Sequence, residues 1–256
     1  MKKLSVIKIY ARQRPFFLGL IRSVEVGLFR KYFLKKGPVL DLGCGDGFFA
    51  SLAFGRLDVG ADLEGSRISE AKQSKVYKKL ITFNGTNIPL PDRAVTTVVS
   101  NCVLEHVEQL GDLLKDTYRI LRPGGRIYAT VMNQPWEENL LGTRLFGERY
   151  KKFMRKTQNH NNLLTAVEWN KKFRKAGFKI IVEKGYLTPR ACKIIEVAHY
   201  FSFPSLIIHY LWGKWSLGTG WVEQLNLTKL ESALEREIDP VQAGALFIVA
   251  MKTSGK

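Results

Sequence analysis

The sequence predicts an α/β fold in which a mostly parallel, doubly wound sheet carries helices on both faces. Short apolar and β-branched segments alternate with helix-like segments between residues 38 and 132, which is the pattern of βαβ units. The first of these segments runs directly into a glycine cluster at residues 43–47, a place where such sheets bind ligands. The 256 residues are 45% hydrophobic, which is enough for one large core. We therefore expect one domain.

The individual elements follow from short runs of apolar residues and from turn signals. Strands are expected at Pro38–Leu42, Leu57–Asp62, Ile81–Gly85, Thr96–Asn101 and Arg126–Met132. The helices between them are expected at Phe48–Phe54, from the N-cap Ser66 through Ser74, and at Asp112–Leu121. Farther along the chain, a helix is expected at Ala166–Ala176 and strands at Phe178–Tyr186 and Gly244–Thr253.

The net charge of +17 is concentrated in two segments of the chain. Residues 1–37 carry ten Lys and Arg against one acid, and residues 142–190 carry thirteen against three. The residues between them, 38–141, are close to neutral. Two interpretations stay open: a solvated surface, or attraction to an anionic acceptor or surface.

The cysteines and the first residues favour a cytoplasmic protein. Cys44, Cys102 and Cys192 are odd in number and share no metal-ligand spacing, which predicts free thiols and no metal site. Basic residues such as Lys8 and Arg12 interrupt the first apolar run before it reaches the length of a signal peptide.

Acidic residues beside the glycine cluster distinguish between two classes of nucleotide cofactor. A pyrophosphate is bound by G-x-G-x-x-G and a bare helix N-terminus, with no acid nearby. Here the spacing is G-x-G-x-G, flanked by Asp41 and Asp46, whose carboxylates attract the ammonium and sulfonium of S-adenosylmethionine and repel a pyrophosphate. Asp62 ends the second predicted strand, where an acid binds ribose hydroxyls, and Glu64 is a competitor for that role.

These residues resemble the class I S-adenosylmethionine-dependent methyltransferases, in particular the group called methyltransferase type 11. VLDLGCGDGFF is similar to the first motif of that family, and VGADLEGSRISEA to its ribose-binding strand and helix. NGTNIPLPD resembles the adenine-side segment, and VVSNCVLEHV and YRILRPGGRIYAT resemble the motifs of the fourth and fifth strands. The resemblance covers about Pro38–Asn133. It implies a Rossmann-like sheet of seven strands, the last antiparallel, with S-adenosylmethionine as cofactor.

The resemblance also assigns residues to the cofactor. The cofactor-binding residues that we expect are Asp41, Gly43, Cys44, Gly45, Gly47, Asp62, Leu63, Asn84, Gly85 and Asn101. Asn84 stands where the family commonly has Asp, but its side-chain oxygen is still able to accept a hydrogen bond from the adenine amino group.

Two histidines are the candidates for a general base, which is needed only when the acceptor must lose a proton. His106 follows the fourth predicted strand, and His160 lies in the polar segment Gln158–Asn162. The alternatives are a helix-start residue for His106 and a loop residue for His160. We expect His199 to be a core or interface residue.

The segments outside the cofactor-binding core are expected to cover the acceptor. We divide the single domain into a basic helical cap (1–37), a cofactor-binding core (38–135), a basic insertion with the sixth strand (136–190), a hydrophobic helical lid (191–243) and the last strand (244–256). The lid holds the aromatic residues Tyr200, Phe201, Phe203, Tyr210, Trp212 and Trp215, which suit a lid, a membrane interface or a dimer contact.

The acceptor itself is not specified by these patterns. A small or lipid-linked acceptor, such as a lipid or glycan, is our preferred interpretation. An RNA acceptor is the second, although no separate nucleic-acid module is evident. A third is a non-catalytic subunit that only binds the cofactor. We expect the two basic segments and the aromatic stretch to face an anionic membrane together.

Overall fold

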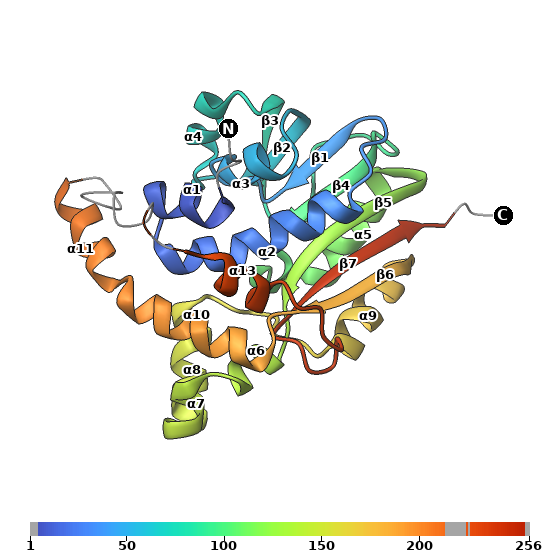
Figure 1. The fold of residues 1–256 in the computed structure, drawn as a ribbon. Helices are drawn as coiled ribbons and strands as arrows, with labels where there is room; N and C mark the ends of the chain where they lie inside the picture. Colours follow the sequence, from blue (N-terminus) through green and yellow to red (C-terminus); the bar gives the residue numbers. More distant parts are fainter. Residues whose placement is uncertain (1–4, 213–223, 225, 254–256) are drawn as a thin grey trace.

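The computed structural model describes residues 5–212, 224 and 226–253, and within them seven strands form one sheet. The strands are β1 (Val39–Leu42), β2 (Leu57–Leu63), β3 (Tyr77–Phe83), β4 (Val95–Asn101), β5 (Leu121–Met132), β6 (Phe178–Tyr186) and β7 (Ala245–Lys252). Their order in the sheet is β3-β2-β1-β4-β5-β7-β6. Strands β1 to β5 are parallel, and β7 lies antiparallel between β5 and β6 (Figure 1). The predicted doubly wound α/β sheet with an antiparallel last strand is confirmed.

Helices cover both faces of this sheet (Figure 1). The helices before β6 are α1 (Val6–Gln13), α2 (Phe16–Tyr32), α3 (Phe48–Ala53), α4 (Ile68–Ser74), α5 (Leu110–Ile120), α6 (Pro135–Glu138), α7 (Leu141–Phe146), α8 (Glu148–Thr157) and α9 (Ala166–Lys175). Those after it are α10 (Pro189–Phe201), α11 (Phe203–Trp212) and α13 (Thr228–Leu234). A short 3₁₀ turn, η1 (Leu104–His106), follows β4. No helix in the described part of the chain is both long enough and apolar enough to cross a bilayer.

Alternating side chains of the strands divide the interior into two apolar cores. In β1, Val39 belongs to the core under α2, α3 and α10, whereas Leu40 and Leu42 belong to the core under α5 and α9. This alternation is expected of a strand that is buried on both faces. On the first side, Phe29 of α2 packs edge-on against Phe247 of β7, with ring centres 5.3 Å apart.

The third strand lies earlier in the chain than the sequence predicts. We expected Ile81–Gly85, and the strand is Tyr77–Phe83. It forms an edge of the sheet, so Lys78 and Lys79 face solvent and interrupt the apolar run that marks a buried strand.

Two helix boundaries also differ from the prediction. Ser66 is not the N-cap of α4, because Arg67 occupies that position and the Ser66 hydroxyl accepts only a long hydrogen bond, 3.4 Å, from the Ile68 amide. The helix before β5 ends at Ile120, and the chain is already extended from Leu121, five residues before the predicted start of the strand.

Helices from several of the predicted segments contact one another on the face of the sheet that α2 covers. Helix α2 packs against α3, α10 and α13, which come from three separate parts of the chain. The predicted lid falls partly outside the described residues: this holds for Trp215 as a whole and for the side chains of Phe203 and Trp212.

A buried carboxylate fastens α2 to the sheet. Glu25 is 0% exposed, and its oxygens accept hydrogen bonds from Asn101 Nδ2 (2.8 Å), Tyr186 Oη (2.9 Å) and Arg22 Nη1 (2.5 Å). These partners lie at the ends of β4 and β6 and on α2 itself. The cost of burying the charge is offset because every partner is a donor and one is a cation.

We therefore expect Glu25→Ala to lower the free energy of unfolding by about 3–5 kcal/mol, the usual effect of removing one member of a buried ion pair. Urea denaturation at neutral pH measures this change. The matched control is Glu237→Ala, which removes a more exposed carboxylate paired with Lys31 and Lys184 and should lose at most about 1 kcal/mol. Equal losses in the two variants would contradict the role given to Glu25.

Candidate active site

The glycine cluster forms a tight loop between β1 and α3 that only glycine fits. Gly43, Gly45 and Gly47 all have positive φ, at 77°, 51° and 77°. A Cβ on Gly43 would lie 2.3 Å from the side chain of Val103. The loop is anchored to β2, because the Gly43 and Cys44 amides donate to the Ala61 carbonyl at 2.8 and 3.1 Å.

Asp62 connects the end of β2 to this loop. Its Oδ2 accepts a hydrogen bond from the Gly45 amide at 2.6 Å, and its Oδ1 accepts from the Leu63 amide at 2.7 Å. Each carboxylate oxygen keeps a further lone pair, which is the arrangement that two ribose hydroxyls need. Glu64 is exposed and lies beyond the strand.

A cleft of about 530 Å³ opens beside the loop. Five of the predicted cofactor residues line it: Gly43, Asp62, Leu63, Asn84 and Gly85. The other five, Asp41, Cys44, Gly45, Gly47 and Asn101, are not among its lining residues. A Cβ on Gly45 would meet no atom within 4 Å, so the space beside the loop is free for a ligand. The open loop, the Asp62 carboxylate and the cleft together fit S-adenosylmethionine.

The adenine-side residues behave differently from the expectation in one respect. Asn84 Oδ1 already accepts hydrogen bonds from the amides of Thr86 and Asn87, at 3.2 and 3.0 Å, and so stabilises its own turn. This oxygen is therefore engaged in the turn, and its acceptance from an adenine amino group stays a prediction. The amide NH₂ of Asn84 is the group that remains for the cleft.

The acids beside the loop also have partners that sequence reasoning missed. Asp46 pairs with Arg14 and, at 3.0 Å, with Arg67, so its charge is neutralised instead of attracting a cationic cofactor. Asp41 is buried, and its Oδ2 accepts a hydrogen bond from Tyr77 Oη at 2.6 Å. Burial raises the pKa of Asp41 to about 7; Tyr77 opposes this rise and the Asp62 charge adds to it.

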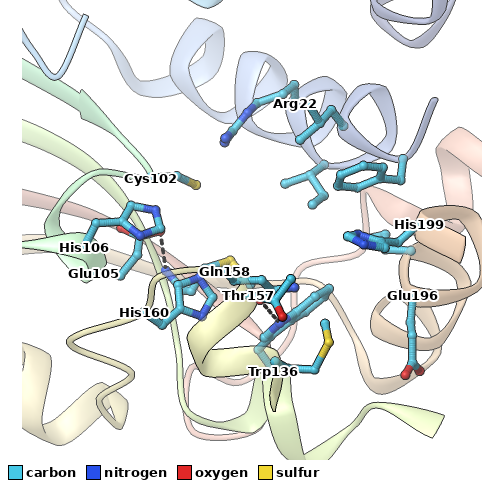
Figure 2. Close-up of a pocket in the computed structure, with 16 residues that line it drawn as sticks. Arg22, Cys102, Glu105, His106, Trp136, Thr157, Gln158, His160, Glu196 and His199 are labelled. Atoms are coloured by element: carbon cyan, nitrogen blue, oxygen red, sulfur yellow. Dashed lines mark hydrogen bonds between the residues drawn. The ribbon is translucent and has the colours of Figure 1, made fainter. Parts of the chain in front are cut away.

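A second cavity, of about 280 Å³, adjoins the cleft and shares Cys102 and His106 with it. Figure 2 shows its polar side chains, which come from α2, the turn after β4, the end of α8 with the loop that follows it, and α10. Apolar side chains form the rest of its wall, among them Phe17, Leu18, Ile21, Met132, Trp136, Met154 and Ile195. An apolar cavity with a few polar groups in its wall is the usual form of a small-molecule site.

The two predicted histidines lie together in this cavity. The rings of His106 and His160 stack with their centres 5.3 Å apart. His106 Nδ1 lies 2.9 Å from the Asn159 carbonyl, which only accepts, so Nδ1 carries the proton and the lone pair is on Nε2. Burial lowers the pKa of His160 to about 4, and the nearby His106 adds to that effect.

Several side chains of the cavity were not predicted. Arg22 and Trp136 line it, and so does His199, which we expected to be a core or interface residue. The hydroxyls, amides and rings that meet here come from distant segments. The one signal available was Arg22, whose ion-pair partner Glu25 lies three residues later in a largely apolar stretch of α2.

Glu105 is buried and Asn101 is half-buried, and both lie close in the chain to the residues that the two cavities share. Glu105 is 0% exposed, and its Oε2 has no hydrogen-bond partner within the described residues. Burial raises its pKa, and the neighbouring His106 and Arg22 oppose that rise. Asn101 donates to Glu25 and, at 2.6 Å, to Thr130 Oγ1, so it holds the strand end in place instead of facing the cleft.

The Asp62 geometry generates the first cofactor prediction. Asp62→Ala should weaken S-adenosylmethionine binding by about ten- to a hundredfold, since each charge-assisted hydrogen bond contributes about 1.5–3 kcal/mol. Isothermal calorimetry measures the affinity, and Glu64→Ala is the control, expected to stay within a few-fold of the unaltered protein. The opposite ranking would show that the wrong acid has been chosen.

The raised pKa of Asp41 generates a pH prediction. A carboxyl with a pKa of about 7 gains its negative charge as the pH rises through 7, and that charge favours a cationic ligand. The affinity for S-adenosylmethionine should therefore increase a few-fold between pH 6 and pH 8. Asp41→Asn should flatten this dependence. If the affinity of the Asp41→Asn variant depended on pH as steeply as that of the unaltered protein, Asp41 would be excluded as the source of the pH dependence.

Comparison with known proteins assigns the family. A family model described as a methyltransferase domain matches residues 10–183. The chain is 32% identical over 110 residues to a malonyl-[acyl-carrier protein] O-methyltransferase from Yersinia pestis, a match that covers 39% of this chain and spans 41% of that relative.

Two solved structures share the fold. A methyltransferase from Thermotoga maritima that uses S-adenosylmethionine superposes with a TM-score of 0.61 and 18% identity, over 93% of this chain and 91% of that one. A Haemonchus contortus phosphoethanolamine N-methyltransferase in complex with S-adenosyl-L-methionine superposes with a TM-score of 0.58 and 16% identity, over 99% and 61%. The chain has the glycine loop, an acid near the end of β2 and the sheet order described above, and it belongs to the class I S-adenosylmethionine-dependent methyltransferases.

Proposed function

We propose that the protein transfers the methyl group of S-adenosylmethionine to a small or lipid-linked acceptor whose body is apolar. The observation that carries this proposal is the junction between the two cavities. The cleft beside the glycine loop and the apolar cavity under α2, α8 and α10 share Cys102 and His106. An acceptor in the second cavity would therefore reach the first one at these residues.

The residues around the first cleft would hold the cofactor. Asp62 would accept the ribose hydroxyls, Gly43 and Gly45 would let the methionyl part approach the backbone, and Asn84 would lie beside the adenine. When bound there, S-adenosylmethionine supplies an electrophilic methyl group next to the acceptor cavity. Holding the two reactants in line can account for much of the rate of such a displacement.

His106 is the group that we assign to the acceptor's proton. Its Nδ1 is occupied by the Asn159 carbonyl, so Nε2 is the nitrogen with the lone pair. The acceptor oxygen or nitrogen would form its bond to the methyl carbon as the methyl–sulfur bond breaks and the thioether leaves with that electron pair, and the acceptor's proton would pass to Nε2. His160, with its pKa lowered to about 4, is a weak base and is assigned to packing beside the His106 ring.

The similarity of the chain to known methyltransferases does not identify its acceptor. The relatives named above carry names as different as malonyl-[acyl-carrier protein] O-methyltransferase and phosphoethanolamine N-methyltransferase. The apolar wall of the cavity favours a hydrocarbon or ring-bearing acceptor over a strongly polar one.

The test uses methyl-labelled S-adenosylmethionine. The purified protein is incubated with lipid, soluble small-molecule and RNA fractions of a cell extract, and the labelled product is identified by mass spectrometry. Label in the lipid or the small-molecule fraction supports the proposal. Label in RNA alone would show that the acceptor is RNA instead of a small or lipid-linked molecule. Cofactor binding with no labelled product in any fraction would favour a non-catalytic subunit.

Once a labelled product is known, His106→Gln should lower turnover by about a hundredfold or more, the contribution of a positioned general base. Cofactor affinity should stay within a few-fold, because His106 acts on the acceptor. His160→Gln, the matched control, should lose less than about tenfold. If turnover fell equally in the two variants, the roles assigned to the two rings would be wrong.

A further inference from the structure

The outer face of α7 and α8 exposes large apolar side chains. Leu145, Phe146 and Phe153 are 74%, 66% and 57% exposed. The two helices project from the body of the molecule, at the bottom of Figure 1. Exposed aromatic and leucine side chains gathered on one projection are a mark of an interaction site.

Unpaired cations share this face. Arg149, Lys152, Phe153 and Lys156 follow the spacing of residues on one side of a helix, and Arg144 lies on α7. All four cations are exposed, and none makes an ion pair within the residues that the structure describes. We call Arg144, Leu145, Phe146, Arg149, Lys152, Phe153 and Lys156 the α7–α8 face.

The acids of this region form ion pairs with the other two cations of α8. Lys151 pairs with Glu138 at 2.7 Å and with Glu148 at 2.8 Å, and Arg155 Nε donates to Glu137 at 2.6 Å. The helix is therefore divided along its length. One side is neutralised against α6, and the other keeps its positive charge beside exposed apolar side chains.

Aromatic contacts join the α7–α8 face to α10, and α8 itself also lines the apolar cavity. The ring of Tyr150 lies 6.5 Å from that of Phe146 and 6.3 Å from that of Phe153. The Tyr150 hydroxyl also lies 2.6 Å from that of Tyr200 on α10, whose own side chain is 52% exposed. On its inner side, α8 lines the cavity with Met154, Thr157 and Gln158.

We propose that the α7–α8 face docks on an anionic lipid bilayer, with its apolar side chains entering the interface and its cations over the headgroups. The combination of aromatic or leucine side chains with Lys and Arg is what such an interface binds. Because α7 and α8 project from the body of the molecule, they are able to contact a flat surface such as a bilayer. A second copy of this chain is disfavoured, because a symmetric contact would bring the same cations face to face. Docking on lipid requires neither cofactor nor acceptor, so it stands independently of the proposed function.

The experiment is sedimentation with vesicles of phosphatidylcholine alone and of phosphatidylcholine mixed with phosphatidylglycerol, at low and high salt. The full chain should bind the mixed vesicles and not the neutral ones. The cationic part of the binding should weaken in high salt, where the screening length falls to about 3 Å. Arg149→Glu combined with Lys152→Glu should lower the affinity by about tenfold or more.

Two further variants separate this face from general basicity. Phe146→Ser combined with Phe153→Ser should lose the salt-resistant part of binding while keeping the fold, because both side chains are exposed. The matched control is Lys171→Glu combined with Lys175→Glu, which reverses two exposed cations on α9, away from the α7–α8 face. That control should bind like the unaltered protein.

Three outcomes would overturn the proposal. One is an equal loss of vesicle binding in the α9 control, which would show that binding depends only on the net charge of the protein. Another is tight binding to a single-stranded RNA of mixed sequence without vesicle binding. The third is a concentration-dependent dimer in light scattering that disappears in the Phe146→Ser, Phe153→Ser variant, again without vesicle binding.

Discussion

The buried carboxylate of Glu25 is the interaction on which both cavities depend. It joins α2 to the ends of β4 and β6, which lie far apart in the chain. The Cys102 thiol donates to the same carboxylate at 3.0 Å, so α2 positions one of the two residues that the cleft and the apolar cavity share. A single charge, surrounded by donors that leave it no alternative arrangement, thus fixes how the N-terminal helices close over the sheet.

Local features of the site could be predicted from the sequence, and features that need several segments could not. The turn at Gly43, Gly45 and Gly47 is encoded within five residues of the chain, because the positive φ at each of the three positions favours glycine. Asp62 follows from its place at a strand end. In contrast, Arg22, Trp136 and His199 meet only after α2, α6 and α10 have packed, and no spacing in the chain reports that meeting. The β3 boundary was missed because an edge strand carries solvent-facing lysines.

The large positive charge is used in two different ways. In the first basic segment, several cations form ion pairs with acids of the same chain: Arg14 pairs with Asp46, Arg22 with Glu25, and Lys31 with Glu237. In the second, α8 neutralises one side and leaves the other free. The sequence showed two equivalent basic segments, whereas the structure distinguishes charge that supports the fold from charge that faces outward. What separates the two kinds of cation is whether an acidic partner lies nearby, and that partner comes from elsewhere in the chain.

The position of β7 has a consequence for how the chain acquires its structure during synthesis. β7 lies between β5 and β6 and supplies hydrogen-bond partners to both. β6 is made before α10, α11 and α13, yet it has no neighbour in the sheet until β7 follows them. The ribosome must therefore release most of the chain while two strand edges are still unpaired, and such edges are prone to association with other chains. Shielding by a chaperone would matter most in that interval, and slow translation of the segment before β7 would prolong it.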